Sequence, residues 1–199
     1  MSRVLLILIA TLALAGAGCS GSDSDNATAQ SAVPLPKAFP RIPTYDTVYV
    51  APDCLPCGFE VNANASVTAR EPDSAPEGTV WADIAYPAYN ATLRLTFTPV
   101  TAATRHNVIA NRRERMMLNF ADNSVQITEL HSPEAGYTTA ILTAPAARVT
   151  PVQFVGFNDR WVISGALEMH RLTDSDPDSI MPMLRAVESD IIHSATHLR

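Results

Sequence analysis

Alternating apolar and polar residues are the clearest pattern in the chain. Along 91–98, Leu93, Leu95 and Phe97 lie on one face of an extended segment, and threonines with one arginine occupy the other. This period of two is typical of a half-buried strand. Alternation, or runs of β-branched and aromatic residues, predicts further strands at 47–50, 59–70, 79–86, 125–130, 137–143, 148–155 and 160–170.

The strand pattern also predicts where some aromatic residues lie. We expect Trp161, Ile163 and Leu167 to share a core-facing side of the last strand, and residues 156–159 to form a hairpin turn before it. Trp81, Trp161 and Tyr86 fall on strand patterns, so we interpret them as core or interface residues before ligand-stacking residues.

Two segments have helical spacing. The first is 101–120, where Thr101 is a candidate cap and an arginine-rich side is expected opposite the apolar positions Val108, Ile109, Met116, Met117 and Phe120. The second begins with helix-start residues at 176–179, and its apolar positions are Ile180, Leu184, Val187, Ile191, Ala195 and Leu198. This second pattern predicts an amphipathic C-terminal helix.

The order of these elements predicts the fold class. Strands occur in runs, with one helix between the runs and one after them, which favours an α+β domain over alternating βαβ units. We therefore expect an antiparallel β-sheet flanked by two main helices, the middle helix and the C-terminal helix.

The first residues have the pattern of an export signal. Arg3 precedes an apolar run from Val4 to Ala15, which is shorter than the ~20 residues that span a bilayer. Small residues then lead to Cys19, as in a bacterial lipobox, although Gly16 stands where leucine is usual. We predict that 1–18 is a lipoprotein signal peptide and that Cys19 carries acyl chains such as palmitate. The alternative is an ordinary signal peptide with a leftover thiol.

The region after Cys19 differs in composition from the rest. Residues 19–40 are rich in Ser, Asp, Gly, Pro and Ala, which predicts a flexible tether, and 41–199 then forms a single α+β domain. The net charge of -6 argues against binding to nucleic acid through a basic surface. The expected location is the cell envelope, with the domain lipid-anchored and facing the periplasm or at the outer membrane.

Cys54 and Cys57 form a C-x-x-C pair. Outside the cytoplasm such a pair favours a disulfide, and in thioredoxin-like proteins it is a redox site whose first thiol lies at a helix N-terminus. The residues that follow here, 58–66, have a strand pattern instead of a helical one. A structural disulfide or an inert pair is therefore the favoured interpretation over a catalytic redox site.

Asp190, His193 and His197 fall on one face of the C-terminal helix. Two histidines four residues apart can share a zinc ion. However, His197 is close to the chain end, where helices fray, and spacing ties no further ligand to the three. We therefore predict a solvated polar face, no metal site and no cofactor. His106, His131 and His170 are predicted to be surface or helix-end residues.

Four paired segments, in fixed order, resemble the gliding-motility lipoprotein family GldD, found in bacteria of the Bacteroidota type. They comprise an arginine-proline-tyrosine lead-in with a later Phe-Glu step, a tryptophan and tyrosine-proline strand block, a glutamine-phenylalanine and glycine-alanine-leucine hairpin, and a proline-containing C-terminal helix. In this chain they are 40–45 with 59–60, 81–87 with 90–97, 153–155 with 165–167, and 177–182 with 190–192. The run at 112–115 departs from the family, because arginines stand where a lysine-containing block is usual.

The resemblance implies a function. Members of the family are envelope lipoproteins needed for gliding motility and the associated type IX secretion machinery, and they act as assembly or support components. No catalytic residue comes with the resemblance, so we expect a protein that is not an enzyme and that has envelope proteins of a gliding or secretion complex as partners. The alternatives from the residues are a periplasmic thiol-disulfide module using Cys54 and Cys57, and a carrier of a hydrophobic ligand.

Overall fold

The computed structural model describes residues 47–120, 124–132, 135–147, 150–170 and 177–199, and side chains in the last range from 181. The chain divides into two compact units, 1–40 and 41–199, and the described residues belong to the second. The predicted signal peptide, Cys19 and the tether therefore lie outside the described residues.

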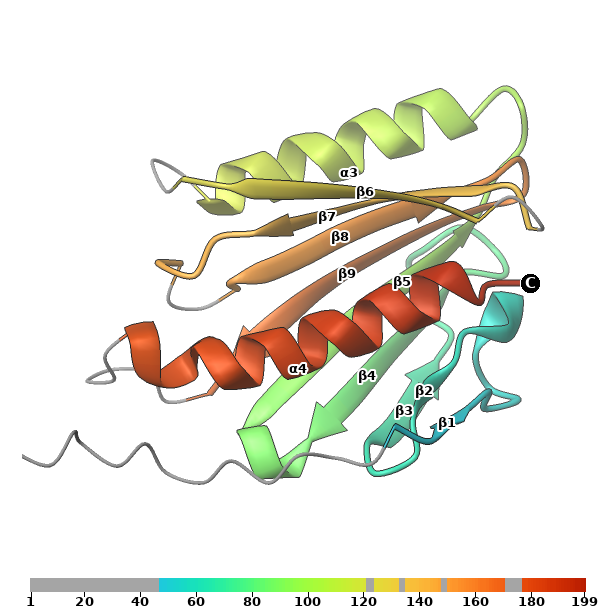
Figure 1. The fold of residues 1–199 in the computed structure, drawn as a ribbon. Coiled ribbons are helices and arrows are strands. Elements are labelled where there is room, and N and C mark those ends of the chain that lie inside the picture. Colours follow the sequence, from blue (N-terminus) through green and yellow to red (C-terminus); the bar gives the residue numbers. More distant parts are fainter. Residues whose placement is uncertain (1–46, 121–123, 133–134, 148–149, 171–176) are drawn as a thin grey trace, which may run out of the picture. The chain divides into compact units, whose positions relative to one another are not determined.

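Most of the described strands form one large antiparallel sheet (Figure 1). Its seven strands run in the order β3-β4-β5-β9-β8-β7-β6, and β1 and β2 form a separate pair. The bounds are β1 Tyr49–Val50, β2 Val61–Asn62, β3 Ser66–Arg70, β4 Val80–Tyr86, β5 Ala91–Pro99, β6 Gln126–Ser132, β7 Tyr137–Thr143, β8 Val152–Phe157 and β9 Trp161–Met169. Two short 3-10 turns, η1 Pro56–Gly58 and η2 Pro87–Tyr89, and two helices, α3 Arg105–Phe120 and α4 Pro177–Thr196, complete the domain. The prediction of an α+β fold is confirmed.

Pairing of β5 with β9 joins the two halves of the sheet. One half is the run β3-β4-β5, the other is the run β6-β7-β8-β9, and residues 91–99 pair with 161–169 between them. The long pairing is possible because both strands alternate in phase, with Leu93 opposite Leu167 and Phe97 opposite Ile163. Helix α3 connects the two halves.

The two helices cover opposite faces of the sheet. Leu184, Val187 and Ile191 of α4 belong to a large apolar cluster, together with strand residues such as Leu93 and Phe154. The strand neighbours whose side chains point the other way form a second cluster with α3: Met116, Phe120, Ala140, Leu142, Val155 and Val162. Successive strand residues thus divide between two cores, as a pleated sheet requires. Helix α3 packs closely on β8 and β9, so the β3-β4-β5 half of that face is not covered by this helix.

Three details of the predicted elements are wrong. The predicted strand 59–70 is interrupted after Asn62, whose side-chain oxygen accepts the backbone N–H of Asn64 and closes a turn before β3. The middle helix begins at Arg105, four residues after the cap candidate Thr101, and residues 102–104 form a turn in which the hydroxyl of Thr104 accepts the backbone N–H of Thr101. Met117, predicted for the apolar side of this helix, is 54% exposed.

Other predictions are confirmed. The side-chain oxygen of Asn158 accepts the backbone N–H groups of Arg160 and Trp161 and thereby closes the expected hairpin between β8 and β9. Ile163 and Leu167 are fully buried, and Trp161 is half-buried at the edge of the same cluster. In the part of the chain that the structure describes, no helix has both the length and the apolar character that crossing a membrane demands.

Candidate functional site

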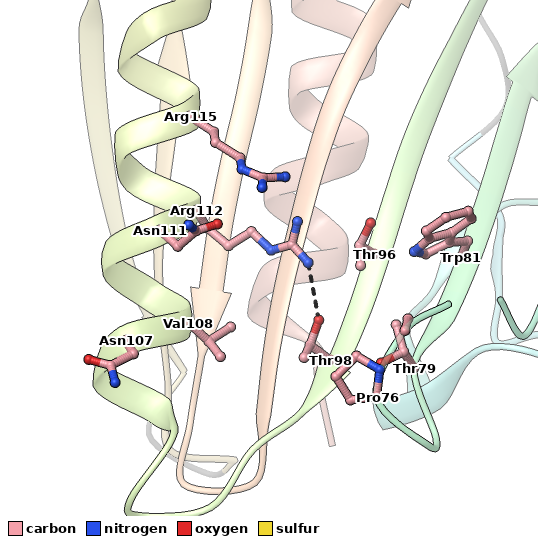
Figure 2. Close-up of a pocket in the computed structure, with 11 residues that line it drawn as sticks. Pro76, Thr79, Trp81, Thr96, Thr98, Asn107, Val108, Asn111, Arg112 and Arg115 are labelled. Carbon is pink, nitrogen blue, oxygen red and sulfur yellow. Dashed lines mark hydrogen bonds between the residues drawn. The ribbon is translucent and has the colours of Figure 1, made fainter. Parts of the chain in front are cut away.

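A groove lies between α3 and the part of the sheet that this helix leaves uncovered (Figure 2). Its volume is about 500 Å³. Strands β4 and β5 contribute Trp81, Thr96 and Thr98, the loop before β4 contributes Ala75, Pro76 and Thr79, and α3 contributes Asn107, Val108, Asn111, Arg112 and Arg115. The two charged residues of this lining are both arginines, and Figure 2 shows their side chains directed from the helix toward the sheet.

The helical repeat explains why Arg112 faces the groove. It is four residues after Val108 and four before Met116, so it lies on the side of α3 that packs on the sheet. Its guanidinium donates a hydrogen bond to the hydroxyl of Thr98, with 3.4 Å between the nitrogen and the oxygen. Burial and the neighbouring positive charge of Arg115 both lower the pKa of Arg112. Arg112 therefore does not belong to the arginine-rich side that was expected opposite the apolar positions.

Within the part of the chain that the structure describes, Arg112 and Arg115 line one groove without a negative partner, whereas other arginines of the domain are paired. Arg94 pairs with Glu168 at 2.7 Å, and Arg105 contacts Asp159. Among the described residues, neither Arg112 nor Arg115 has a carboxylate within salt-bridge distance. We call this surface the arginine groove.

An exposed indole ring and a hydroxyl without a hydrogen-bond partner in the described part of the chain lie at the edges of the arginine groove. Trp81, expected in a core or interface, is 36% exposed there, and the guanidinium of Arg70 lies 5.3 Å from its ring centroid. The hydroxyl of Thr79 is buried at the margin and has no hydrogen-bond partner among the described residues. A hollow with two unpaired guanidinium groups, hydroxyl and amide side chains and an exposed indole suits a ligand that carries carboxylates or other anions.

A second cluster joins the end of α4 to the segment 48–62. The hydroxyl of Tyr49 donates a hydrogen bond to Asp190 at 2.7 Å, and its ring stacks on His193 with 3.5 Å between centroids. Ser194 donates to the backbone carbonyl of Glu60 at 2.5 Å. Burial raises the pKa of Asp190, although hydrogen bonds from Tyr49 and Asn62 and the charge of His193 oppose this effect. Burial and the contact with Asp190 raise the pKa of Tyr49.

Glu60 is the centre of this cluster, which we call the C-terminal junction. Its Oε2 lies 2.8 Å from Nε2 of His193, and its Oε1 lies 3.4 Å from the guanidinium of Arg199. Glu60, His193 and His197 each offer one atom that could bind a metal, and these three atoms lie within 4.8 Å of one another. The predicted solvated polar face is wrong for Asp190, which is buried and hydrogen-bonded to Tyr49.

Of the three possible metal ligands that the sequence suggested, the structure keeps the two histidines together and separates Asp190 from them. His193 and His197 stay together, with 4.1 Å between ring centroids, but Asp190 is hydrogen-bonded to Tyr49. Glu60 takes its place beside the histidines. The sequence offered one signal for Glu60, because it belongs to the Phe-Glu step that resembles the GldD family, but nothing in its spacing connected it to α4.

The cysteine pair lies at the 3-10 turn η1. Cys54 is exposed and Cys57 is half-buried, and both are free thiols in the structure. Burial raises the pKa of Cys57, against smaller opposing effects of Tyr137 and Arg160. In a thioredoxin-like site the first thiol, here Cys54, lies at a helix N-terminus, whereas the 3-10 turn η1 and strand β2 follow Cys54 in the structure. Whether the pair forms a disulfide in the envelope stays a prediction.

The remaining predicted positions have ordinary surroundings. His106, His131 and His170 are exposed, as expected, and the last two have hydroxyl neighbours in Thr138 and Thr92. Tyr86 is buried in the α4-side core.

Fold and surface together define a class of protein: an α+β domain on one antiparallel sheet, with a cationic groove on one face and a helix-to-strand junction at the chain end. The chain belongs to the family described as gliding motility lipoprotein GldD, whose family model matches residues 29–198. The resemblance noted from the sequence is therefore confirmed, and with it a role related to gliding motility, a lipoprotein character and association with the membrane in the cell envelope. No curated protein and no solved structure matches the chain.

Proposed function

We propose that this lipoprotein is a non-catalytic component that supports gliding motility and the type IX secretion machinery, and that its arginine groove holds an acidic segment of an envelope partner. It is anchored through acyl chains on Cys19 with its domain in the periplasm or at the outer membrane. The observation that carries the contact surface is the unpaired couple Arg112 and Arg115 in one groove. The family match supports the motility role.

Charge explains why the partner segment is acidic. Two guanidinium groups that lie together repel each other, and the pKa of Arg112 is already lowered by burial and by Arg115. A carboxylate placed between them removes the repulsion and gains charge-assisted, bidentate hydrogen bonds. The chain as a whole has more acidic than basic residues. A partner attracted by the overall charge would be basic, whereas a partner that binds the arginine groove must place acidic residues at that groove.

The alternative functions have less support. A thiol-disulfide module needs a helix whose N-terminus activates the first cysteine, whereas a short 3-10 turn follows Cys54. A carrier of a hydrophobic ligand needs space between the sheet and α4, whereas Leu184, Val187 and Ile191 pack there against the strands.

Co-purification tests the proposal. The full chain is cross-linked in cells and isolated from membranes as wild type, as Arg115→Glu, as Arg112→Glu/Arg115→Glu and as the control Arg185→Glu. Arg185 is exposed on α4, which packs on the opposite face, so the control matches the change in charge. We expect wild type and Arg185→Glu to recover the same envelope proteins, and both groove variants to lose them.

Two results would overturn the proposal. One is recovery of the same partners by Arg115→Glu, whose substituted side chain is exposed and whose folding is checked by its melting temperature. The other is recovery of lipoprotein-processing enzymes alone by the wild-type chain.

A further inference from the structure

We propose that Glu60, His193 and His197 form a zinc site at the C-terminal junction. The proposal is independent of the arginine groove and of the partner that the groove holds. It begins from the convergence of one carboxylate oxygen and two imidazole nitrogens within 4.8 Å. Two histidines and one glutamate are a ligand set that binds zinc in proteins, with the fourth position open to water or to another donor.

The structure removes both objections that the sequence raised against a metal. The first was that a helix end frays, but here Leu198 is buried and the backbone N–H of Arg199 donates to the carbonyl of Cys57 at 2.8 Å. The second was that no further ligand was tied to the histidines. Glu60 lies 133 residues before His193 in sequence and 2.8 Å from it in space.

Neighbouring groups orient the ligands. Nδ1 of His197 lies 2.8 Å from the carbonyl oxygen of His193, and a hydrogen bond between them leaves Nε2 with a free lone pair for a metal. Nε2 of His193 faces Oε2 of Glu60, and the ring of His193 is held by stacking on Tyr49. A hydrogen bond from the second ring nitrogen to a carbonyl, as in His197, is characteristic of histidine ligands because it fixes the ring and its tautomer.

The distances require a small adjustment. Zinc bonds of ~2.1 Å at the tetrahedral angle place ligand atoms about 3.4 Å apart, against 2.8 Å between Glu60 and His193 in the structure. For zinc to bind here, Nε2 of His193 must offer its lone pair, so this ring would carry its proton on Nδ1. Oε1 of Glu60 remains available to Arg199, and the exposed ring of His197 has room to turn toward the ion. The bound ion would tie the end of α4 to the strand β2 region.

Zinc titration of the full chain in detergent, after treatment with a chelator, tests the site. We expect calorimetry to give one zinc ion per chain, and cobalt to give the visible absorption of a tetrahedral site. Glu60→Gln and His197→Ala should each weaken zinc affinity by more than ~10-fold, since even outer-shell changes cost that much. Zinc should also raise the melting temperature of the wild-type chain.

The control variants are His131→Ala and His106→Ala, which remove exposed histidines elsewhere on the domain. Both should bind zinc as the wild-type chain does. The proposal is overturned if the wild-type chain takes up no zinc, or if Glu60→Gln and His197→Ala retain its affinity. His197 is exposed, so its replacement is not expected to prevent folding, and the melting temperature without metal verifies this.

Discussion

Arg199, the last residue, donates its backbone N–H to the carbonyl oxygen of Cys57 at 2.8 Å. This bond fixes the chain end to the turn that carries the cysteine pair, and it places Leu198 in the core. The last residues are therefore part of the folded domain and contribute to its stability.

Replacing Leu198 by alanine should destabilise the domain. The side chain is 5% exposed, and truncating a buried leucine costs about 2–5 kcal/mol. We expect about 2 kcal/mol, at the lower limit because the site is close to the surface, measured as the free energy of unfolding in urea. Ser189→Ala, at an exposed position of α4, is the control and should change stability by less than about 0.5 kcal/mol. Equal stability of the two variants would show that the chain end is not docked.

Gly165 of β9 should not tolerate a side chain. A Cβ atom there would lie 2.2 Å from Cε1 of Phe154 and 2.8 Å from Cδ2 of Leu95. We expect Gly165→Ala to lower the free energy of unfolding by about 3 kcal/mol, the upper end of the usual cost of overpacking. Adding Phe154→Leu should restore part of that loss because it removes the ring.

Gly136→Ala gives a comparison for that cost. Nothing lies within 4 Å of a Cβ there, but φ is +65°, so the expected loss is about 1 kcal/mol from backbone strain. A loss at Gly165 no larger than the loss at Gly136 would contradict the close packing of β9 on β8.

Asp190 should make stability depend on pH. Its pKa is raised in the folded state, first by burial, so above the usual value of 3.8 the folded state retains a proton that the unfolded chain has released. The free energy of unfolding must then fall as pH rises from 3.8 to the raised pKa of the folded state. The total fall is about 1.4 kcal/mol for each unit by which the pKa is raised. We expect the difference in unfolding free energy between wild type and Asp190→Asn to decrease from about pH 4 upward and then become constant.

The measurement is urea unfolding of both proteins at a series of pH values. The amide introduced by Asp190→Asn is still able to accept the hydrogen bond from Tyr49, so the comparison isolates the charge. A difference that stays level, or that grows with pH, would contradict a raised pKa for Asp190.

The two thiols should react at different rates. Cys54 is exposed, whereas Cys57 is half-buried and burial raises its pKa, so less of it is the reactive thiolate. In the reduced chain we expect iodoacetamide to label Cys54 before Cys57, as followed by peptide mass spectrometry at neutral pH. The difference should disappear in denaturant. Equal or faster labelling of Cys57 would contradict the burial of this thiol. The thiol-disulfide interpretation is tested separately, by a dithiol turnover assay with Cys54→Ser as the control.

The sequence predicted the sheet well because strand periodicity is a local property. Leu93, Leu95 and Phe97 alternate in phase with Ile163 and Leu167, and both strands are central in the structure. The turn after Asn62 was missed because the alternation of apolar residues continues through it, while a single side-chain hydrogen bond redirects the backbone.

The sites were harder to predict because they depend on tertiary contacts. Glu60 and His193 meet across 133 residues, and no local pattern encodes that contact. Arg112 did offer a local signal, since its spacing from Val108 and Met116 places it on the inner side of α3. The loop before β4 and the open half of the sheet, which complete the groove, could be placed only by the fold.

Complementation of a strain that lacks this gene tests the central claim most directly, by recording cell gliding and the secretion of type IX substrates. The account predicts that full-length wild type, Arg185→Glu and Cys54→Ser/Cys57→Ser restore both activities, and that Arg112→Glu/Arg115→Glu, present in the envelope at equal amount, restores neither. Full rescue by the groove variant, or loss of rescue in the cysteine variant alone, would contradict it.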